Sequence, residues 1–218
     1  MRVTSRTGMA GLAALAAVSA SCGADGSSTP GTAACAGVEA VCGTVRGTAF
    51  RAIGGIAGAL PTADCSLGRV GGTWLTFSAG LDLARPENLC VEVAGARYVG
   101  AILLAYDPPQ PAAPVRPGSY PAAGGTDAGA HPYLFAVDAS CRGLGPNVLG
   151  TSGAITIDSA TDTRVSGAVD LAFADGSRVA GRFDVPVAFS MDTCAWLTSG
   201  GAHPAACPSG VTCLPAAP

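Results

Sequence analysis

The stretch TRVSGAVDLAFADGSRVAGRFDVPVAF, residues 163–189, alternates apolar and polar residues on both sides of an Asp-Gly pair. A period of two places successive side chains on opposite faces of a β-strand, so each arm has one apolar and one polar face. The apolar positions are Val165, Val169, Leu171 and Phe173 on the first arm and Val179, Phe183, Val185 and Val187 on the second. The stretch therefore predicts a β-hairpin with one buried face.

The turn of this hairpin follows from the parity of its two arms. A two-residue loop would pair apolar positions of one arm with polar positions of the other, because a slip of one residue inverts every side chain. A three-residue loop at 174–176 instead pairs Leu171 with Val179. It also places Gly176 where a type I turn followed by a G1 bulge needs a positive φ. We expect this register.

The sequence on either side of the hairpin contains more short runs of this kind. Further strands are expected at 43–53, 72–79, 89–94, 98–106, 132–139 and 152–160. The last of these would extend the hairpin into a meander through a turn near Thr161 and Asp162. No segment has a helical period over three turns, although a short helix could lie within 82–96. Eight or so short strands predict an all-β fold, an antiparallel sandwich or barrel.

Proline-rich segments interrupt and end this pattern. Residues 106–125 form a long proline-rich connection between two expected strands, and the tail at 207–218 is too rich in proline for a strand. We expect a single β-rich domain over 35–218, with a Pro/Cys-rich C-terminal tail from about residue 199.

The amino-terminal segment has the charge pattern of an export signal. Arg2 and Arg6 precede the uncharged run at 8–20, and the first acidic residue is Asp25. A helix over that run would be about 20 Å long. A bilayer core is about 30 Å thick. We therefore expect this segment to target the chain for export without spanning the membrane.

The sequence SASC at 19–22 resembles the lipobox of bacterial lipoproteins. The resemblance implies that residues 1–21 are a signal peptide and that Cys22 becomes the diacylated first residue of the mature protein. The implied location is the bacterial cell envelope, at the outer membrane if the host has one. The alternative is ordinary cleavage after VSA at 18–20. Residues 22–34 are small and polar, so we expect a flexible tether between the anchor and the domain.

The nine cysteines give a second indication of export. Without Cys22, eight remain as candidates for disulfide bonds: Cys35, Cys42, Cys65, Cys90, Cys141, Cys194, Cys207 and Cys213. An even set in an exported chain indicates up to four disulfides, with the connectivity open. The alternative is that Cys22 pairs too, which leaves one of the nine unpaired in a monomer. Cys207 and Cys213 could close on each other or staple the tail to the domain.

The composition excludes one class of partner. The chain carries 12 basic and 15 acidic residues, a formal net charge of −3. No basic patch is available for nucleic acid.

Candidate residues for catalysis or metal binding are few. No catalytic or phosphate-binding motif occurs, so we expect no enzyme and no cofactor. His131, Asp138 and Ser140 could form a triad only if the fold assembled them. The cysteine spacings match no common zinc site, and Asp158 and Asp162 are interpreted as solvated turn residues rather than as calcium ligands.

The aromatic residues, including Trp74, Tyr98, Tyr106 and Trp196, lie far apart in the sequence and are assigned to the core or its rim. Two functions follow from these observations. The first is a membrane-anchored, non-enzymatic domain for protein interaction or envelope structure. The second is a lipocalin-like carrier of a small apolar ligand, which would need a closed barrel with a cavity.

Overall fold

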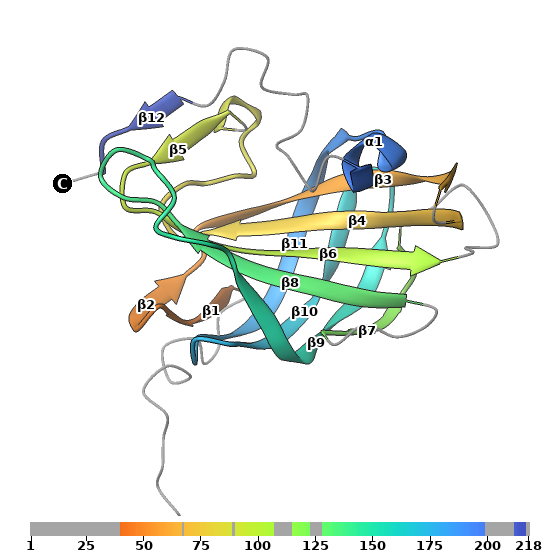
Figure 1. The fold of residues 1–218 in the computed structure, drawn as a ribbon, viewed down its shortest axis with the longest axis horizontal. Helices are drawn as coiled ribbons and strands as arrows, with labels where there is room; N and C mark the ends of the chain where they lie inside the picture. Colours follow the sequence, from red (N-terminus) through yellow and green to blue (C-terminus); the bar gives the residue numbers. More distant parts are fainter. Residues whose placement is uncertain are drawn as a thin grey trace, which may run out of the picture.

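The structure is a computed structural model that describes residues 40–66, 68–88, 90–106, 115–122, 128–198 and 212–216. The strands are β1 (Val41–Val45), β2 (Thr48–Arg51), β3 (Gly54–Cys65), β4 (Gly68–Ser78), β5 (Val91–Val93), β6 (Arg97–Tyr106), β7 (Gly118–Pro121), β8 (Ala128–Ala136), β9 (Val148–Ala160), β10 (Arg164–Phe173), β11 (Arg178–Ser190) and β12 (Thr212–Leu214). The helices are the 3-10 turn η2 (Pro86–Asn88) and the short α1 (Thr193–Thr198). The all-β prediction is confirmed (Figure 1).

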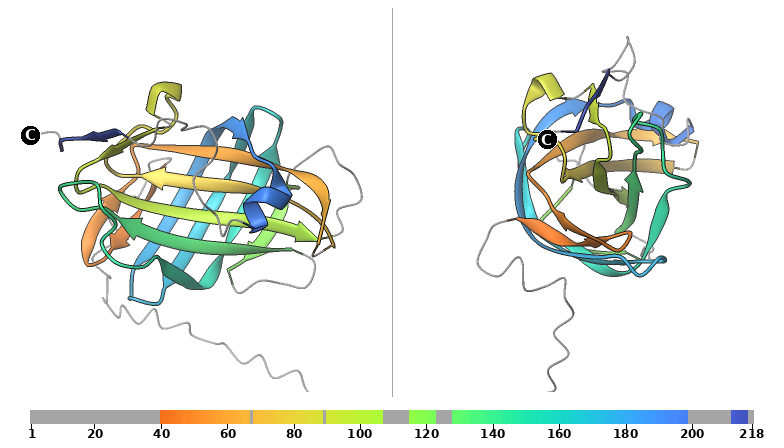
Figure 2. Two further views of the ribbon diagram at one scale, coloured as in Figure 1. Left: turned by 45° about the horizontal axis from the view of Figure 1, so that its top comes forward. Right: turned by 90° about the vertical axis from the view of Figure 1, so that its left-hand side faces the viewer.

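Seven strands close into a barrel. Their order around the wall is β10, β9, β8, β6, β4, β3 and β11, and β11 pairs again with β10. The view along the barrel shows the closed ring (Figure 2, right). Neighbouring strands of this ring are antiparallel except β3 and β11, which are parallel. Of the two expected architectures, sandwich and barrel, the chain forms the barrel.

The hairpin at 163–189 has the predicted register. Leu171 pairs with Val179, and the amide of Phe173 donates to the carbonyl of Ser177 at 3.0 Å. Gly176 has a φ of 83°, the left-handed conformation that the turn requires. β9 adds to β10 through the turn at 161–163, so the predicted meander is also confirmed.

The single strand expected at 43–53 is wrong, because the segment is the hairpin β1–β2. Arg46 and Gly47 form its two-residue turn, with φ values of 50° and 73°. Positive φ at both central residues is typical of a type I′ turn, for which Asn-Gly is the usual sequence signal and Arg-Gly is not. The Arg46 guanidinium holds this conformation by donating to the carbonyls of Leu144 and Pro146, at 2.5 and 3.0 Å.

Other elements also differ from the sequence expectation. β3 was missed because it is rich in Gly and Ala and is buried on both faces along Ile56–Gly58, so its sequence does not alternate. The proline-rich connection contains β7, and the tail contains β12. Within 82–96 the helical segment is only the 3-10 turn η2, whereas the strand expected at 89–94 is confirmed as β5.

Buried apolar side chains pack together inside the barrel. Its core cluster draws buried residues from strands all around the barrel and includes Phe50, Leu75, Phe77, Val99, Leu103, Leu134, Ile155, Ile157, Val165, Leu171 and Phe183. Val115, Tyr120 and Ala122, from β7 and its flanks, belong to the same cluster. These inward residues include the apolar positions predicted for the hairpin.

β11 pairs with two different strands, β1 and β3, along the same edge. Its residues 178–181 pair with β1, and Val187, Phe189 and Ser190 pair with β3. Among the described residues, none pairs with 182–186 on that edge. The two partners diverge there, and we call this gap in the wall the seam.

Candidate functional site

A pocket lies at the seam. Its volume is about 140 Å³, and it opens to solvent between β11, the start of β1 and the link from β2 to β3. The side chains around it include Val41, Ala52, Ile53, Phe77, Phe183 and Val185, with Arg182 and Asp184 alongside. We call this the seam pocket.

The floor of the seam pocket is aromatic. Phe77 from β4 and Phe183 from β11 meet edge to face, with ring centroids 5.4 Å apart and an interplanar angle of 61°. Gly55 makes room for the side chains of Phe77 and Val185. A Cβ at residue 55 would lie 2.7 Å from Phe77 Cδ1 and 2.8 Å from Val185 Cγ1. The floor therefore depends on Gly55, which lies at the start of β3, before the residues of β3 that pair with β11.

The rim of the pocket combines an exposed apolar residue with charges. Ile53 is 58% exposed. On the other side, Arg182 and Asp184 alternate with Phe183 and face outward. The Arg182 guanidinium forms an ion pair with Asp158 at 2.5 Å.

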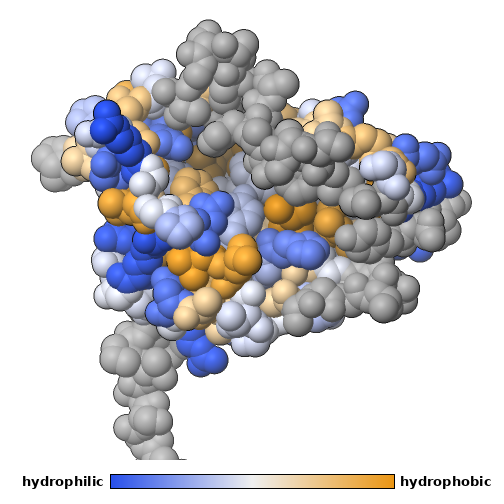
Figure 3. Space-filling view, viewed as in Figure 1, coloured by the Kyte–Doolittle hydropathy of each residue, from blue (hydrophilic) through white to orange (hydrophobic). Residues whose placement is uncertain are grey.

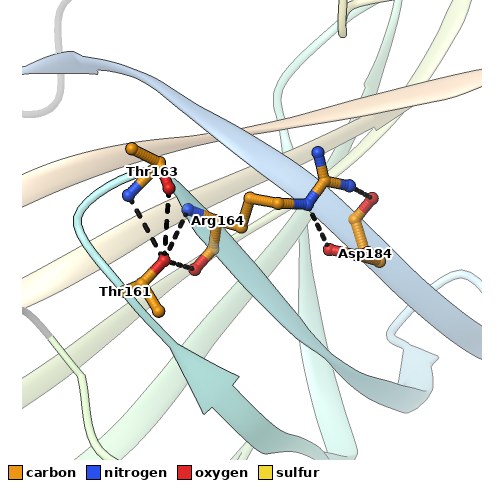
Figure 4. A network of polar contacts seen from close by, with 4 residues as sticks. All are labelled: Thr161, Thr163, Arg164 and Asp184. Atoms are coloured by element: carbon orange, nitrogen blue, oxygen red, sulfur yellow. Dashed lines mark hydrogen bonds and ion pairs between the residues drawn. The ribbon is translucent and has the colours of Figure 1, made fainter.

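Asp184 is held by Arg164 from the neighbouring strand. Arg164 Nε donates to the Asp184 carboxylate at 2.9 Å, and its Nη2 donates to the Asp184 backbone carbonyl at 3.1 Å (Figure 4). The amide and carbonyl of Arg164 in turn bond the Thr161 hydroxyl in the turn. This ion pair and hydrogen bond raise the pKa of Arg164.

The exposed edge of β11 is poorly suited to bind another strand. Arg164 covers the carbonyl of Asp184, and Pro186 has no amide hydrogen to donate. Charged side chains and proline are the usual means by which proteins protect an open sheet edge. The seam therefore offers a small pocket rather than a pairing edge.

The volume limits what the seam pocket can hold. Sites for drug-sized ligands and cofactors enclose about 300–1,000 Å³. A pocket of about 140 Å³ is closer to the 150 Å³ cavity that admits benzene. It matches one ring or one branched side chain.

The possible triad is not assembled. His131 lies exposed on β8 opposite Ile102, whereas Asp138 lies beyond the other end of the strand. Seven residues of extended chain separate them by roughly 20 Å. Asp138 Oδ1 accepts hydrogen bonds from the amides of Arg142 and Ser140, which lower the pKa of its carboxyl. Asp138 therefore stabilises a turn.

Other predicted ligand residues also have structural roles. Asp158 pairs with Arg182 across the sheet rather than being only solvated. Within the residues that the structure describes, no group of three or more His, Cys, Asp or Glu side chains is placed to hold a metal ion. In the same part of the chain, no helix is long and apolar enough to cross a membrane.

Two disulfides join distant parts of the chain. Cys65 pairs with Cys194 and ties α1 to the end of β3, and Cys141 pairs with Cys213 and staples the tail to the domain. Cys42 and Cys90 are also disulfide-bonded. Cys22, Cys35 and Cys207 lie outside the described residues, so lipidation and the full set of four bridges remain predictions.

The aromatic residues are not dispersed in space. Trp74, Tyr98, Tyr133, Phe135 and Phe189 share the outer face of the barrel over β3, β4, β6 and β8, where apolar groups gather in Figure 3. Tyr98 and Phe135 stack at 4.5 Å, and the indole of Trp74 donates to the Tyr133 hydroxyl. The pattern escaped sequence analysis because the register of β4, β6 and β8 brings these rings together.

Part of this outer cluster is packed beneath neighbouring segments, although Trp74, Tyr133, Phe135 and Phe189 remain half-buried. Leu81, Leu83, Val91 and Val93, from the excursion between β4 and β6, pack against Ile56 and Trp74. Val93 and Val137 pack against Tyr98. Burial raises the pKa of Tyr133 to about 12. The side chains of Tyr106 and Trp196 lie outside the described residues.

Comparison with known proteins identifies no relative. No protein-family model, no curated protein and no solved structure matches the chain.

Proposed function

We propose that this chain is an exported bacterial lipoprotein whose barrel is a non-enzymatic binding domain, held at the cell envelope by an acylated Cys22. The amino-terminal charge pattern and the SASC sequence support the anchor. The disulfides support an oxidising compartment outside the cytosol. The partner is a protein that the barrel wall recognises.

One observation carries the binding function. Buried apolar side chains pack together inside the barrel, while a small open pocket lies in the wall at the seam beside the exposed Ile53. Hot spots of protein interfaces are side chains that enter such small pockets, surrounded by contacts that exclude water. The seam pocket has the size for one such side chain.

Crosslinking in cells tests this function. A photoreactive residue replaces Ile53 at the pocket rim in the full chain, and a control chain carries it in place of the exposed Asp170 on β10. We expect a discrete protein adduct from position 53, absent from position 170 and lost when Ala52→Leu fills the pocket. The same adducts from both positions, or an adduct that persists in the filled pocket, would contradict the proposal.

Closure of the barrel favours a second candidate function, the lipocalin-like carrier of a small apolar ligand. Thr73 supports it, because its hydroxyl faces the interior, is fully buried, and has no hydrogen-bond partner among the residues that the structure describes. Solvent extraction of the purified protein followed by mass spectrometry separates the two functions. A stoichiometric apolar molecule, beyond the acyl groups of the amino terminus, would favour the carrier, and its absence would favour the binding domain.

A further inference from the structure

We propose that Cys22 is the one cysteine that no disulfide of this chain uses, because Cys35 pairs with Cys42 and Cys207 pairs with Cys90. These two pairings are inferred from the described cysteines and do not rest on the proposed function. Acylation of the remaining thiol does rest on that function, and the pairings assign it to a single residue.

The disulfides inside the described part of the chain leave two cysteines whose partners lie outside it. All six described cysteines are disulfide-bonded. Four of them bond one another, as Cys65–Cys194 and Cys141–Cys213. The other two are Cys42, on β1, and Cys90, which directly precedes β5.

Cys42 and Cys90 do not bond each other, because β1 and β5 lie well apart in Figures 1 and 2. Each therefore takes its partner from the three cysteines outside the described residues, Cys22, Cys35 and Cys207. Two of these three are used in this way, and one is left.

The chain that follows Cys207 returns to Cys90. The amide of Thr212 donates to the carbonyl of Cys90 at 2.9 Å. Cys207 precedes Thr212 by five residues, and five residues span at most about 18 Å. The Cα atoms of a disulfide lie within about 7 Å of each other, and they are 5.4 and 5.7 Å apart in the two described bridges. Cys207 is therefore kept near Cys90, whereas Cys22 and Cys35 belong to the chain that leads into β1.

The sulfur of Cys42 lies towards the chain that precedes it. Cys42 Sγ is 3.8 Å from the carbonyl oxygen of Ala40. Cys35 lies seven positions before Cys42, and Cys22 lies twenty positions before it. The entropic cost of closing a flexible loop grows with its length, so the nearer cysteine is favoured. We therefore assign Cys35 as the partner of Cys42.

This assignment leaves the thiol of Cys22 available for acylation. Each disulfide forms when two thiols lose two protons and two electrons to a disulfide-containing oxidant of the envelope, which becomes a dithiol. Cys22 takes no part in this oxidation and keeps its sulfur nucleophilic as the thiolate. Its sulfur then forms a thioether bond with the diacylglyceryl group of a phospholipid. The bond from that group to the phosphate oxygen breaks, and the phosphate headgroup leaves with the thiol proton.

Thiol labelling of the full chain tests the assignment. The protein is denatured without reductant and treated with an alkylating reagent, and the labelled positions are read by mass spectrometry of its peptides. In the wild type, no cysteine should be labelled and Cys22 should carry diacylglyceryl. Cys207→Ser should give one equivalent of label, at Cys90. Cys35→Ser should give one equivalent, at Cys42.

Two further variants are the controls. Cys141→Ser breaks a bridge that the structure describes, so its label should appear at Cys213. Cys22→Ala breaks no bridge and should give no label at any cysteine.

The disulfide-linked peptides of the wild type give a second measurement, which does not depend on the folding of a variant. Cleavage after Glu39 separates Cys35 from Cys42. The peptides that contain these two cysteines should stay joined until they are reduced. A peptide with Cys90 should likewise be joined to one with Cys207.

The outcomes separate this inference from the proposed anchor. Label at Cys42 in Cys22→Ala, or a wild-type peptide that joins Cys22 to Cys42, would overturn both. A lipid on Cys22 together with a bridge from Cys35 to Cys90 would overturn the pairings and keep the anchor. The expected bridges together with an alkylated Cys22 in the wild type would support the pairings and overturn the anchor.

Discussion

Phe77 and Phe183 meet edge to face at 5.4 Å, although their strands β4 and β11 are not neighbours in the barrel wall. β3 lies between these strands, and Gly55 on β3 leaves space for the Phe77 ring. The contact closes the interior at the seam, where β11 changes partner from β1 to β3. The same two rings thus hold the wall together and form the floor of the pocket.

A double-mutant cycle measures this contact. Phe77→Leu and Phe183→Leu should each lower the free energy of unfolding, and the two changes together should cost less than their sum. The expected coupling is about 0.5–1.5 kcal/mol, the range for an aromatic pair. Denaturant unfolding with the disulfides intact gives the three values, and strictly additive losses would show that the rings do not interact.

The turn residue Gly176 should resist substitution by a β-branched residue. Gly176→Val should lower the free energy of unfolding by about 1–3 kcal/mol, because valine adopts a positive φ poorly. No atom lies within 4 Å of the position that a Cβ would take, so the cost comes from the backbone rather than from a clash.

Asparagine provides the control at this position, since it tolerates the left-handed region. Gly176→Asn should lose much less stability than Gly176→Val in the same denaturant titration. Equal losses for the two variants would mean that the φ of residue 176 is not what limits the turn.

The disulfide Cys141–Cys213 should be what keeps β12 on β5. β12 is exposed along its whole length and is held mainly by backbone bonds, such as the amide of Thr212 to the carbonyl of Cys90 at 2.9 Å. A two-stranded sheet without a buried face is marginal in water. In the variant Cys141→Ser/Cys213→Ser, we expect the amides of 212–214 to lose hydrogen-exchange protection while those of β10 and β11 keep theirs.

Removal of the other described disulfide is the matched control. Cys65→Ser/Cys194→Ser leaves the staple at Cys213 in place, so the amides of 212–214 should stay protected. If they exchange equally fast in both variants, β12 does not depend on its own disulfide.

The buried hydroxyl of Tyr133 predicts a late tyrosine titration. Burial raises the pKa of Tyr133 to about 12 and also raises that of Tyr98. The folded state therefore keeps protons that the unfolded state loses above its ordinary tyrosine value of about 10. Stability should fall as the pH rises from about 10 towards 12.

Absorbance at 295 nm follows this titration. The wild type should show a phenolate step near pH 12 that is absent from Tyr133→Phe, and the fall in stability should be smaller in that variant. A wild-type curve that is complete near pH 10 would show that the Tyr133 hydroxyl is not buried.

Strands that are buried on one face can be predicted from sequence, whereas strands that are buried on both faces cannot be recognised by alternation. Alternation fixed the hairpin 163–189 down to its register, because one of its faces is buried and the other is wet. β3 gave no such signal, since Ile56, Ala57 and Gly58 are buried on both faces. The seam pocket was not foreseeable, because it depends on where β1 and β3 separate along one edge of β11.

The outer cluster shows the same limit for long-range pairing. Trp74 and Tyr133 are far apart in the chain and meet only through the register of β4, β6 and β8. The alternation of residues within one strand does not show which strand it pairs with or in which register. The proposed export and anchoring, by contrast, would depend on one local segment, which sequence patterns can address.

We infer that Cys22 is the acylated amino terminus of a binding domain held at a membrane. Two acyl chains anchor stably because each buried methylene contributes about 0.8 kcal/mol, whereas a single chain binds only marginally. The variant Cys22→Ala should keep the barrel and its disulfides but leave the membrane fraction. The most direct measurement is the mass of the amino-terminal peptide of the mature wild type, isolated from fractionated cells. We expect a peptide that begins at Cys22 and carries diacylglycerol, in the membrane fraction. An unmodified peptide that begins at Ser21, in the soluble fraction, would show that Cys22 is not acylated.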